Sequence, residues 1–117
     1  MREYQIDFYE MENGTKPAED FLKTLDSKML AKILRIMDLL EEFGPVLRLP
    51  YSEHLEGDIF ELRAKQGGDI TRVMYFFVAG KRIILTNGFV KKSQKTPKSE
   101  IIKAKKYRED YRRRYGI

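Results

Sequence analysis

The sequence of 117 residues contains no cysteine and no tryptophan, and it has a single histidine, His54. Without cysteine the chain can form neither a disulfide nor a thiolate metal site, which fits a reducing cytoplasm. No stretch approaches the roughly 18 apolar residues that span a bilayer, and the first residues are charged where a signal peptide needs an apolar run. We therefore expect a cytoplasmic protein that does not associate with membranes.

Several catalytic patterns are also absent. The sequence has no glycine-rich phosphate loop, no HExxH zinc motif and no Ser/His/Asp grouping with a recognised spacing. We expect neither a metal nor a cofactor. His54 remains a candidate catalytic residue because an imidazole titrates near neutrality. The alternative is that this lone histidine has no chemical role.

The charges are unevenly distributed along the chain. Residues 1–58 hold 13 acidic and 7 basic side chains, for a net charge of −6, whereas residues 59–117 hold 5 acidic and 16 basic ones, for a net charge of +11. The two halves together give the overall charge of +5. A basic half is the expected footprint of a protein that binds a polyanion. The alternative is a solvated surface on which the two signs segregate.

Hydrophobic periodicity predicts a single α+β domain over residues 1–117, with the element order β-α-α-β-β-β-α. Alternating apolar and polar side chains predict a strand at residues 4–9, and runs rich in apolar β-formers predict strands at residues 59–63, 71–78 and 82–89. Short glycine-containing turns join the last three strands and favour antiparallel hairpins. We expect a small antiparallel or mixed sheet packed against helices, and an irregular connection at residues 46–58.

Three helices complete the prediction. Pro17 suits the first turn of a short helix, and Asp26 or Ser27 can cap a longer one that ends at Gly44-Pro45. In the last helix, which reaches about residue 114, we expect Thr96 to be the N-cap. Its tyrosines at positions 107 and 111 fit a stripe facing the core.

Four basic residues stand where a phosphate could be held. Arg63 and Arg72 lie on two strands joined by one hairpin, so they are neighbours if the register allows. A guanidinium can hold a phosphate through two parallel hydrogen bonds. Lys91 and Lys92 follow the last strand and would close on the same phosphodiester. The alternative is that Arg63 pairs with a nearby acid such as Glu61 and has no further role.

The segments around these residues resemble the RelE/ParE superfamily of bacterial toxins, specifically its HigB-like, phage-derived Gp49-like branch. The resemblance covers nearly the whole chain. The matching segments are Phe60-Glu61-Leu62-Arg63, Thr71-Arg72-Val73-Met74-Tyr75 and Leu85-Thr86-Asn87-Gly88-Phe89-Val90-Lys91-Lys92-Ser93-Gln94-Lys95-Thr96-Pro97, followed by Glu100, Ile101 and Ala104.

The resemblance implies a RelE-like fold and the toxin of a type II toxin–antitoxin system. Such toxins cleave mRNA on the ribosome without a metal, by attack of a ribose 2′-OH on the adjacent phosphate. A helix-turn-helix, HigA-like antitoxin would neutralise the toxin and mediate its oligomers. By this resemblance Arg72 holds the phosphate and Arg63 is a second basic position of the sheet. Lys91 and Lys92 occupy the basic loop after the last strand.

Further residues are candidates for RNA binding. Lys95, Lys98 and Lys105 supply positive charge for phosphates, which position RNA without reading its sequence. Phe89 and Tyr75 could stack on an unpaired base, and the alternative for both rings is core packing.

The sequence departs from the resembled pattern where proton transfer is concerned. Glu61 stands where some relatives carry a lysine, and Asn87 stands where we expect a histidine. The remaining candidates for a general base are His54, Glu61 and a lysine with a lowered pKa, so we expect catalysis mainly by charge and positioning. Two other functions stay open, namely a toxin that inhibits DNA gyrase without cutting nucleic acid, and an inactive module that binds nucleic acid.

Overall fold

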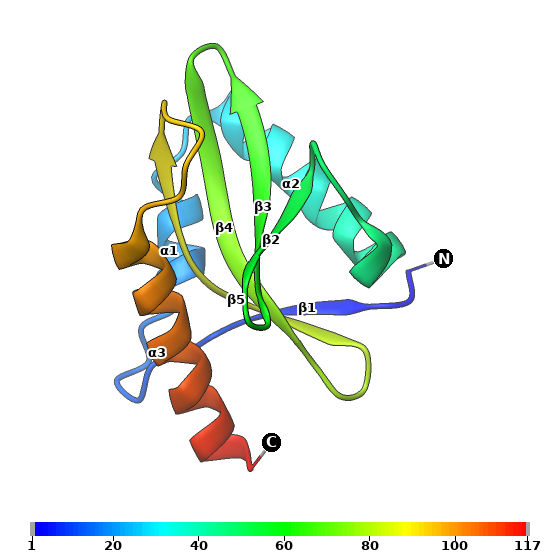
Figure 1. Ribbon diagram of the computed structural model, residues 1–117, viewed down its shortest axis with the longest axis vertical. Coiled ribbons are helices and arrows are strands. Elements are labelled where there is room, and N and C mark those ends of the chain that lie inside the picture. The colour runs from blue at the N-terminus through cyan, green and yellow to red at the C-terminus, as the bar shows by residue number, and fades with distance from the viewer. Residues whose placement is uncertain (1, 117) are drawn as a thin grey trace.

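A five-stranded mixed sheet with helices on both faces forms the protein (Figure 1). The computed structural model describes residues 2–116. The elements in chain order are β1 (Gln5–Phe8), α1 (Pro17–Leu22), α2 (Ser27–Phe43), the short 3-10 helix η1 (Gly44–Val46), β2 (Ser52–Glu56), β3 (Ile59–Gln66), β4 (Asp69–Val78), β5 (Arg82–Lys91) and α3 (Lys98–Tyr115). The α+β class and the two glycine-containing hairpins are confirmed.

The sheet has the strand order β1-β5-β4-β3-β2. The first strand runs parallel to the last, with Ile6 opposite Ile83, and the other neighbours are antiparallel. Because side chains alternate along a strand, each strand serves two cores. Leu62 and Tyr75 pack against α1 and α2, whereas Met74 packs against α3.

Helix α2 begins and ends where its sequence indicates. The Asp26 carboxylate accepts a hydrogen bond of 2.8 Å from the backbone N–H of Met29, which satisfies a free donor of the first turn. Gly44 closes the helix with a φ of 53°. A Cβ at this position would lie 2.3 Å from the ring of Tyr4, so both the backbone angle and the space require glycine.

Two local predictions were wrong. The connection at residues 46–58 contains a fifth strand, β2, which pairs antiparallel with β3. It is short and carries charges, so its own pattern is weak, and its pairing with β3 stabilises it. Thr96 does not cap α3, whose N-cap is Pro97. The Thr96 hydroxyl donates instead to the carboxylate of Glu61, at 2.6 Å.

Within residues 2–116, none of the helices combines the length and the apolar character that crossing a bilayer requires.

Candidate functional site

Strand register brings the predicted phosphate-binding residues together on the face that α3 covers. Arg63 lies opposite Arg72, and Arg72 lies opposite Phe89. Two residues further along β3 and β5, and two residues earlier on β4, the same face carries a second row. In that row Lys65 lies opposite Ile70, and Ile70 lies opposite Lys91. The loop between β5 and α3, residues 92–97, lies over the first of these two rows and is called the covering loop below.

Glu61 lies between the two arginines and is fully buried, as is Arg72. Its carboxylate oxygens lie 3.6 Å from Nε of Arg63 and 3.8 Å from Nε of Arg72. Two facing cations on neighbouring strands repel each other, and the carboxylate between them offsets that repulsion. Arg63 also pairs with Glu53 at 2.8 Å. Arg63 therefore pairs with nearby acids, as one interpretation of the sequence predicted, and it also lies opposite Arg72.

Burial changes the ionisation of this cluster. Desolvation raises the pKa of Glu61, although the hydrogen bond from Thr96 and the charges of Arg63 and Arg72 act in the opposite direction. Desolvation also lowers the pKa of Arg72. A carboxylate with a raised pKa takes up a proton more readily at neutral pH than an exposed one, which is what a general base requires.

The covering loop is held by the residues of this cluster. Arg72 donates to the backbone carbonyl of Ser93, and Arg63 donates to Oε1 of Gln94 at 2.9 Å and to its carbonyl at 3.4 Å. Nε and Nη1 of Arg72 and Oε2 of Glu61 are buried without a hydrogen-bond partner among the residues described. Arg72 thus keeps two donor nitrogens that no acceptor of the described residues satisfies. A phosphate has enough oxygens to satisfy them.

The two candidate aromatic residues have different surroundings. Tyr75 is 1% exposed, its ring stacks on Phe60, and its hydroxyl bonds with that of Ser52. It lies in the core beneath α2, so core packing is the correct interpretation and a base cannot reach the ring. Phe89 lies beside the cluster, with the guanidinium carbon of Arg72 5.6 Å from its ring centre. This cation–π contact stabilises the charged guanidinium of Arg72 at its position.

His54 is not brought to the arginine pair. Strand β2 places it opposite Phe60, whose side chain packs on the α2 side, whereas its neighbour Glu53 lies opposite Glu61. The imidazole contacts the Phe60 ring, and its Nε2 bonds with the carbonyl of Gly57 at 2.6 Å. His54 is thus placed on the opposite face of the sheet from the residues that the sequence grouped with it.

A comparison with protein families finds a match that includes this site. The family model described as phage-derived protein Gp49-like (DUF891) matches residues 20–109. The chain belongs to this family. The matched range contains the arginine pair, Glu61, the whole covering loop and most of α3. No curated protein matches the chain.

The roles of two site residues in this Gp49-like protein were predicted only in part. Glu61 was predicted as a possible base and as a partner of Arg63, but not as a carboxylate between two arginines, and Thr96 was predicted only as a helix cap. One signal was present, because Glu61 and Arg63 are two residues apart on a strand and so share a face. The role of Thr96 had no local signal, since its partner lies 35 residues away.

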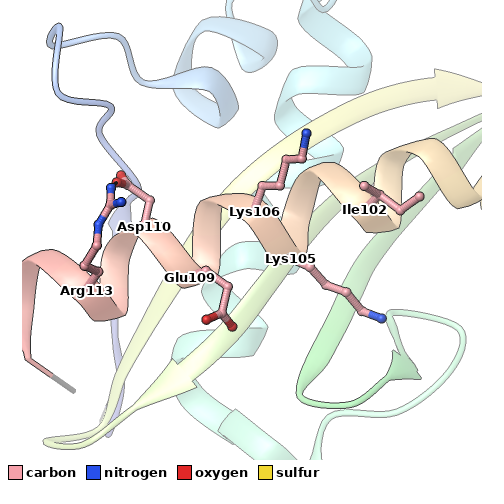
Figure 2. Close-up of a pocket in the computed structure, with 6 residues that line it drawn as sticks. All are labelled: Ile102, Lys105, Lys106, Glu109, Asp110 and Arg113. Atoms are coloured by element: carbon pink, nitrogen blue, oxygen red, sulfur yellow. Dashed lines mark hydrogen bonds and ion pairs between the residues drawn. The ribbon is translucent and has the colours of Figure 1, made fainter.

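Four of the eight basic residues of α3 form ion pairs with acids outside that helix. Arg108 and Arg112 both bind Asp58, and Lys105 binds Glu56. Figure 2 shows six side chains of α3. Arg113 reaches Asp110, whereas the side chain of Lys105 extends from the helix away from that pair. The RNA contact predicted for Lys105 therefore competes with an ion pair inside the protein.

The unpaired positive charge gathers at the covering loop. Between residues 59 and 116, all of which the structure describes, six lysines form no ion pair: Lys65, Lys91, Lys92, Lys95, Lys98 and Lys106. All but Lys106 lie at the ends of β3 and β5, in the covering loop or at the start of α3. Folding thus confines the excess charge of the second half mainly to the end of the molecule that holds the arginine pair.

Proposed function

We propose that this Gp49-like protein is the toxin of a type II toxin–antitoxin system and that it acts in the cytoplasm as a ribosome-dependent mRNA endoribonuclease. The observation that carries the proposal is the pair Arg63 and Arg72 with Glu61 between them, under a loop with exposed lysines. This arrangement offers donors for a phosphodiester and a carboxylate that can accept a proton.

In the proposed reaction, Glu61 accepts the proton of a ribose 2′-OH, and the 2′ oxygen forms a bond to the adjacent phosphorus. The bond from phosphorus to the 5′ oxygen of the next nucleotide breaks, and that oxygen takes a proton from solvent or from a lysine of the covering loop. The products are a 2′,3′-cyclic phosphate and a 5′-OH. Arg63 and Arg72 stabilise the negative charge that develops on the phosphorane.

The covering loop has to move for this reaction. Arg72 is fully buried, and one of its donors is occupied by the Ser93 carbonyl. The phosphate oxygens would take the places of that carbonyl and of the Gln94 oxygens on Arg63. Displacement of the loop would also break the bond between Thr96 and Glu61, which leaves the carboxylate free to act as a base.

The remaining predicted residues have positioning roles in this proposal. Lys91, Lys92, Lys95 and Lys98 are exposed near the cluster and would contact RNA phosphates. The ribosome would hold the mRNA in the reactive geometry, so orientation supplies much of the rate. A helix-turn-helix antitoxin is the proposed neutralising partner. Co-expression of the protein encoded next to this chain tests that part, since growth should then be restored.

The central test compares two conservative substitutions at opposite ends of the sheet. Arg72→Lys keeps the charge but loses the two-pronged geometry, and we expect a loss of mRNA cleavage of about a hundredfold. Arg82→Lys is the matched control, because Arg82 makes a two-pronged contact with Asp7 at 2.9 and 2.6 Å, away from the cluster.

Growth arrest on expression and mRNA 5′ ends mapped by primer extension are the two measurements. Equal activity of the two variants would show that the site assignment is wrong. A loss of DNA supercoiling before any mRNA is cut would instead identify a gyrase inhibitor. Expression of the wild type without any effect on growth would identify an inactive module.

A further inference from the structure

A cavity of about 360 Å³ adjoins the arginine pair on the side away from Phe89. It is lined by Leu49, Pro50, Arg63, Lys65, Ile70 and Gln94. These residues come from three separate parts of the chain, namely the segment before β2, the hairpin of β3 and β4, and the covering loop. Leu49, Pro50 and Ile70 take no part in the proposed reaction.

The floor and one wall of the cavity are fixed by the sheet. Lys65 and Ile70 are register partners on β3 and β4, one step beyond Arg63 and Arg72. The backbone N–H of Arg63 donates to the carbonyl of Tyr51 at 2.8 Å, which holds the segment before β2 against the edge of β3. Leu49 and Pro50 therefore stand at a set position beside the arginine.

The apolar residues of this cavity are not part of either core. Ile70 is 3% exposed, yet within residues 2–116 it belongs to neither of the two core clusters. Leu49 is 61% exposed and is among the residues that line the cavity. Leu49 thus provides an apolar side chain that packing of the fold does not use, whereas Ile70 is an almost fully buried part of the lining.

The polar residues of the cavity define what it can bind. Arg63 and Lys65 place positive charge along one side. Oε1 and the backbone carbonyl of Gln94 accept from Arg63, and no hydrogen bond of the Gln94 amide nitrogen is found among the residues described. A fitting ligand is flat and largely apolar on its faces, has a hydrogen-bond acceptor on its edge, and is attached to an anionic backbone. A nucleobase within an RNA strand has these properties.

We infer that this cavity holds the base of a nucleotide next to the cleaved phosphate, against the exposed side chain of Leu49, with the Gln94 amide donating to the edge of the base. The inference rests on the proposed nuclease function and adds a specificity site to it. It also gives the covering loop a second task. When a phosphate displaces Gln94 from Arg63, the same amide becomes free to contact the base that the phosphate carries.

The test is single-turnover cleavage of mRNA on programmed ribosomes, with one abasic nucleotide moved through the positions around the cut. For the wild type, we expect the abasic nucleotide to slow cleavage about tenfold at one position flanking the cut phosphate. Leu49→Ser should slow cleavage of intact mRNA by a similar factor. In that variant the abasic nucleotide at the same position should cause little further loss, because the contact is already absent.

Val46→Ser is the matched control. Val46 is 66% exposed, lies in the same connecting region, and is not among the residues that line the cavity. It should retain the wild-type rate and the wild-type abasic penalty. Gln94→Ala should keep part of the penalty and lose discrimination among the four bases at that position.

The possible outcomes separate this inference from the proposed function. If the wild type cuts mRNA and Leu49→Ser retains the full abasic penalty, the cavity does not hold a base and the nuclease function stands. If the wild type leaves ribosome-bound mRNA intact, the nuclease function fails and the base site fails with it.

Discussion

Replacement of Thr96 by valine tests whether the covering loop controls access to the arginine pair. The Thr96 hydroxyl donates to the buried carboxylate of Glu61 at 2.6 Å, and valine has nearly the same shape without the donor. A hydrogen bond to a charged group contributes about 1.5–3 kcal/mol. In the open loop both groups are hydrated, so the variant should open more often by a factor of roughly ten to a hundred.

Trypsin cleavage after Lys95 under native conditions measures loop opening, because the next residue, Thr96, is buried and has to leave the fold to enter the protease. Thr96→Ser is the control because it keeps the hydroxyl. We expect cleavage of Thr96→Val to be faster than cleavage of the wild type by a factor of roughly ten to a hundred, with Thr96→Ser close to the wild type. If the loop must open before RNA binds, the protein concentration for half-maximal mRNA cleavage should fall by a similar factor. Equal trypsin cleavage rates of the two variants would refute the proposal that this bond holds the loop.

The effect should depend on pH in a defined direction. Burial raises the pKa of Glu61 above its ordinary value of 4.5. Below the raised pKa the carboxyl is protonated, and a neutral hydrogen bond is weaker, about 0.5–1.5 kcal/mol. The difference in loop opening between Thr96→Val and Thr96→Ser should therefore be largest at pH 8, and it should shrink as the pH falls through the pKa of Glu61.

Three further predictions concern RNA contacts and stability. Combined replacement of Lys91, Lys92 and Lys95 by alanine should lower the salt dependence of RNA binding by roughly two in the log–log slope, whereas Lys105→Ala should change it little, because Lys105 is paired with Glu56. Gly88→Ala should destabilise the fold by about 1–3 kcal/mol in urea unfolding, since its Cβ would lie 2.4 Å from the Phe21 ring, and an unchanged midpoint would contradict this packing. Burial and Asp110 raise the pKa of Tyr9 to about 12, so wild-type stability should fall as the pH rises above 10, and Tyr9→Phe should show a flatter curve in the same range.

The residues of the arginine pair could be predicted from sequence because a hairpin determines its own register. A short turn joins β3 to β4, so Arg63 and Arg72 line up once the turn is located. The turn between β4 and β5 does not place Phe89 opposite Arg72 in the same way, because a register shift between Val73 and Tyr75 intervenes. Asp26, which caps the start of α2, and Gly44, which ends it, could be predicted for the same reason. These features depend on residues within a few positions of one another, where sequence patterns carry most information.

The contacts that could not be predicted join residues far apart in the chain. Thr96 bonds with Glu61 across 35 positions, and Arg108 reaches Asp58 across 50. His54 was grouped with the arginines because it precedes the sheet, yet the pairing of β2 with β3 turns it to the other face. Such outcomes depend on how α3 and the covering loop pack onto the sheet, which no local pattern specifies.

The pairing of α3 with acids of the first half also affects how the molecule approaches its target. With those cations neutralised, most of the unpaired lysines of the second half lie at the end of the protein that carries the covering loop. A charge distribution of this kind turns a diffusing protein in the field of a polyanion, so that its charged end arrives first. The field extends about 8 Å at physiological ionic strength. Encounters would then begin with the arginine pair already facing the RNA, and added salt would slow productive association by randomising that approach.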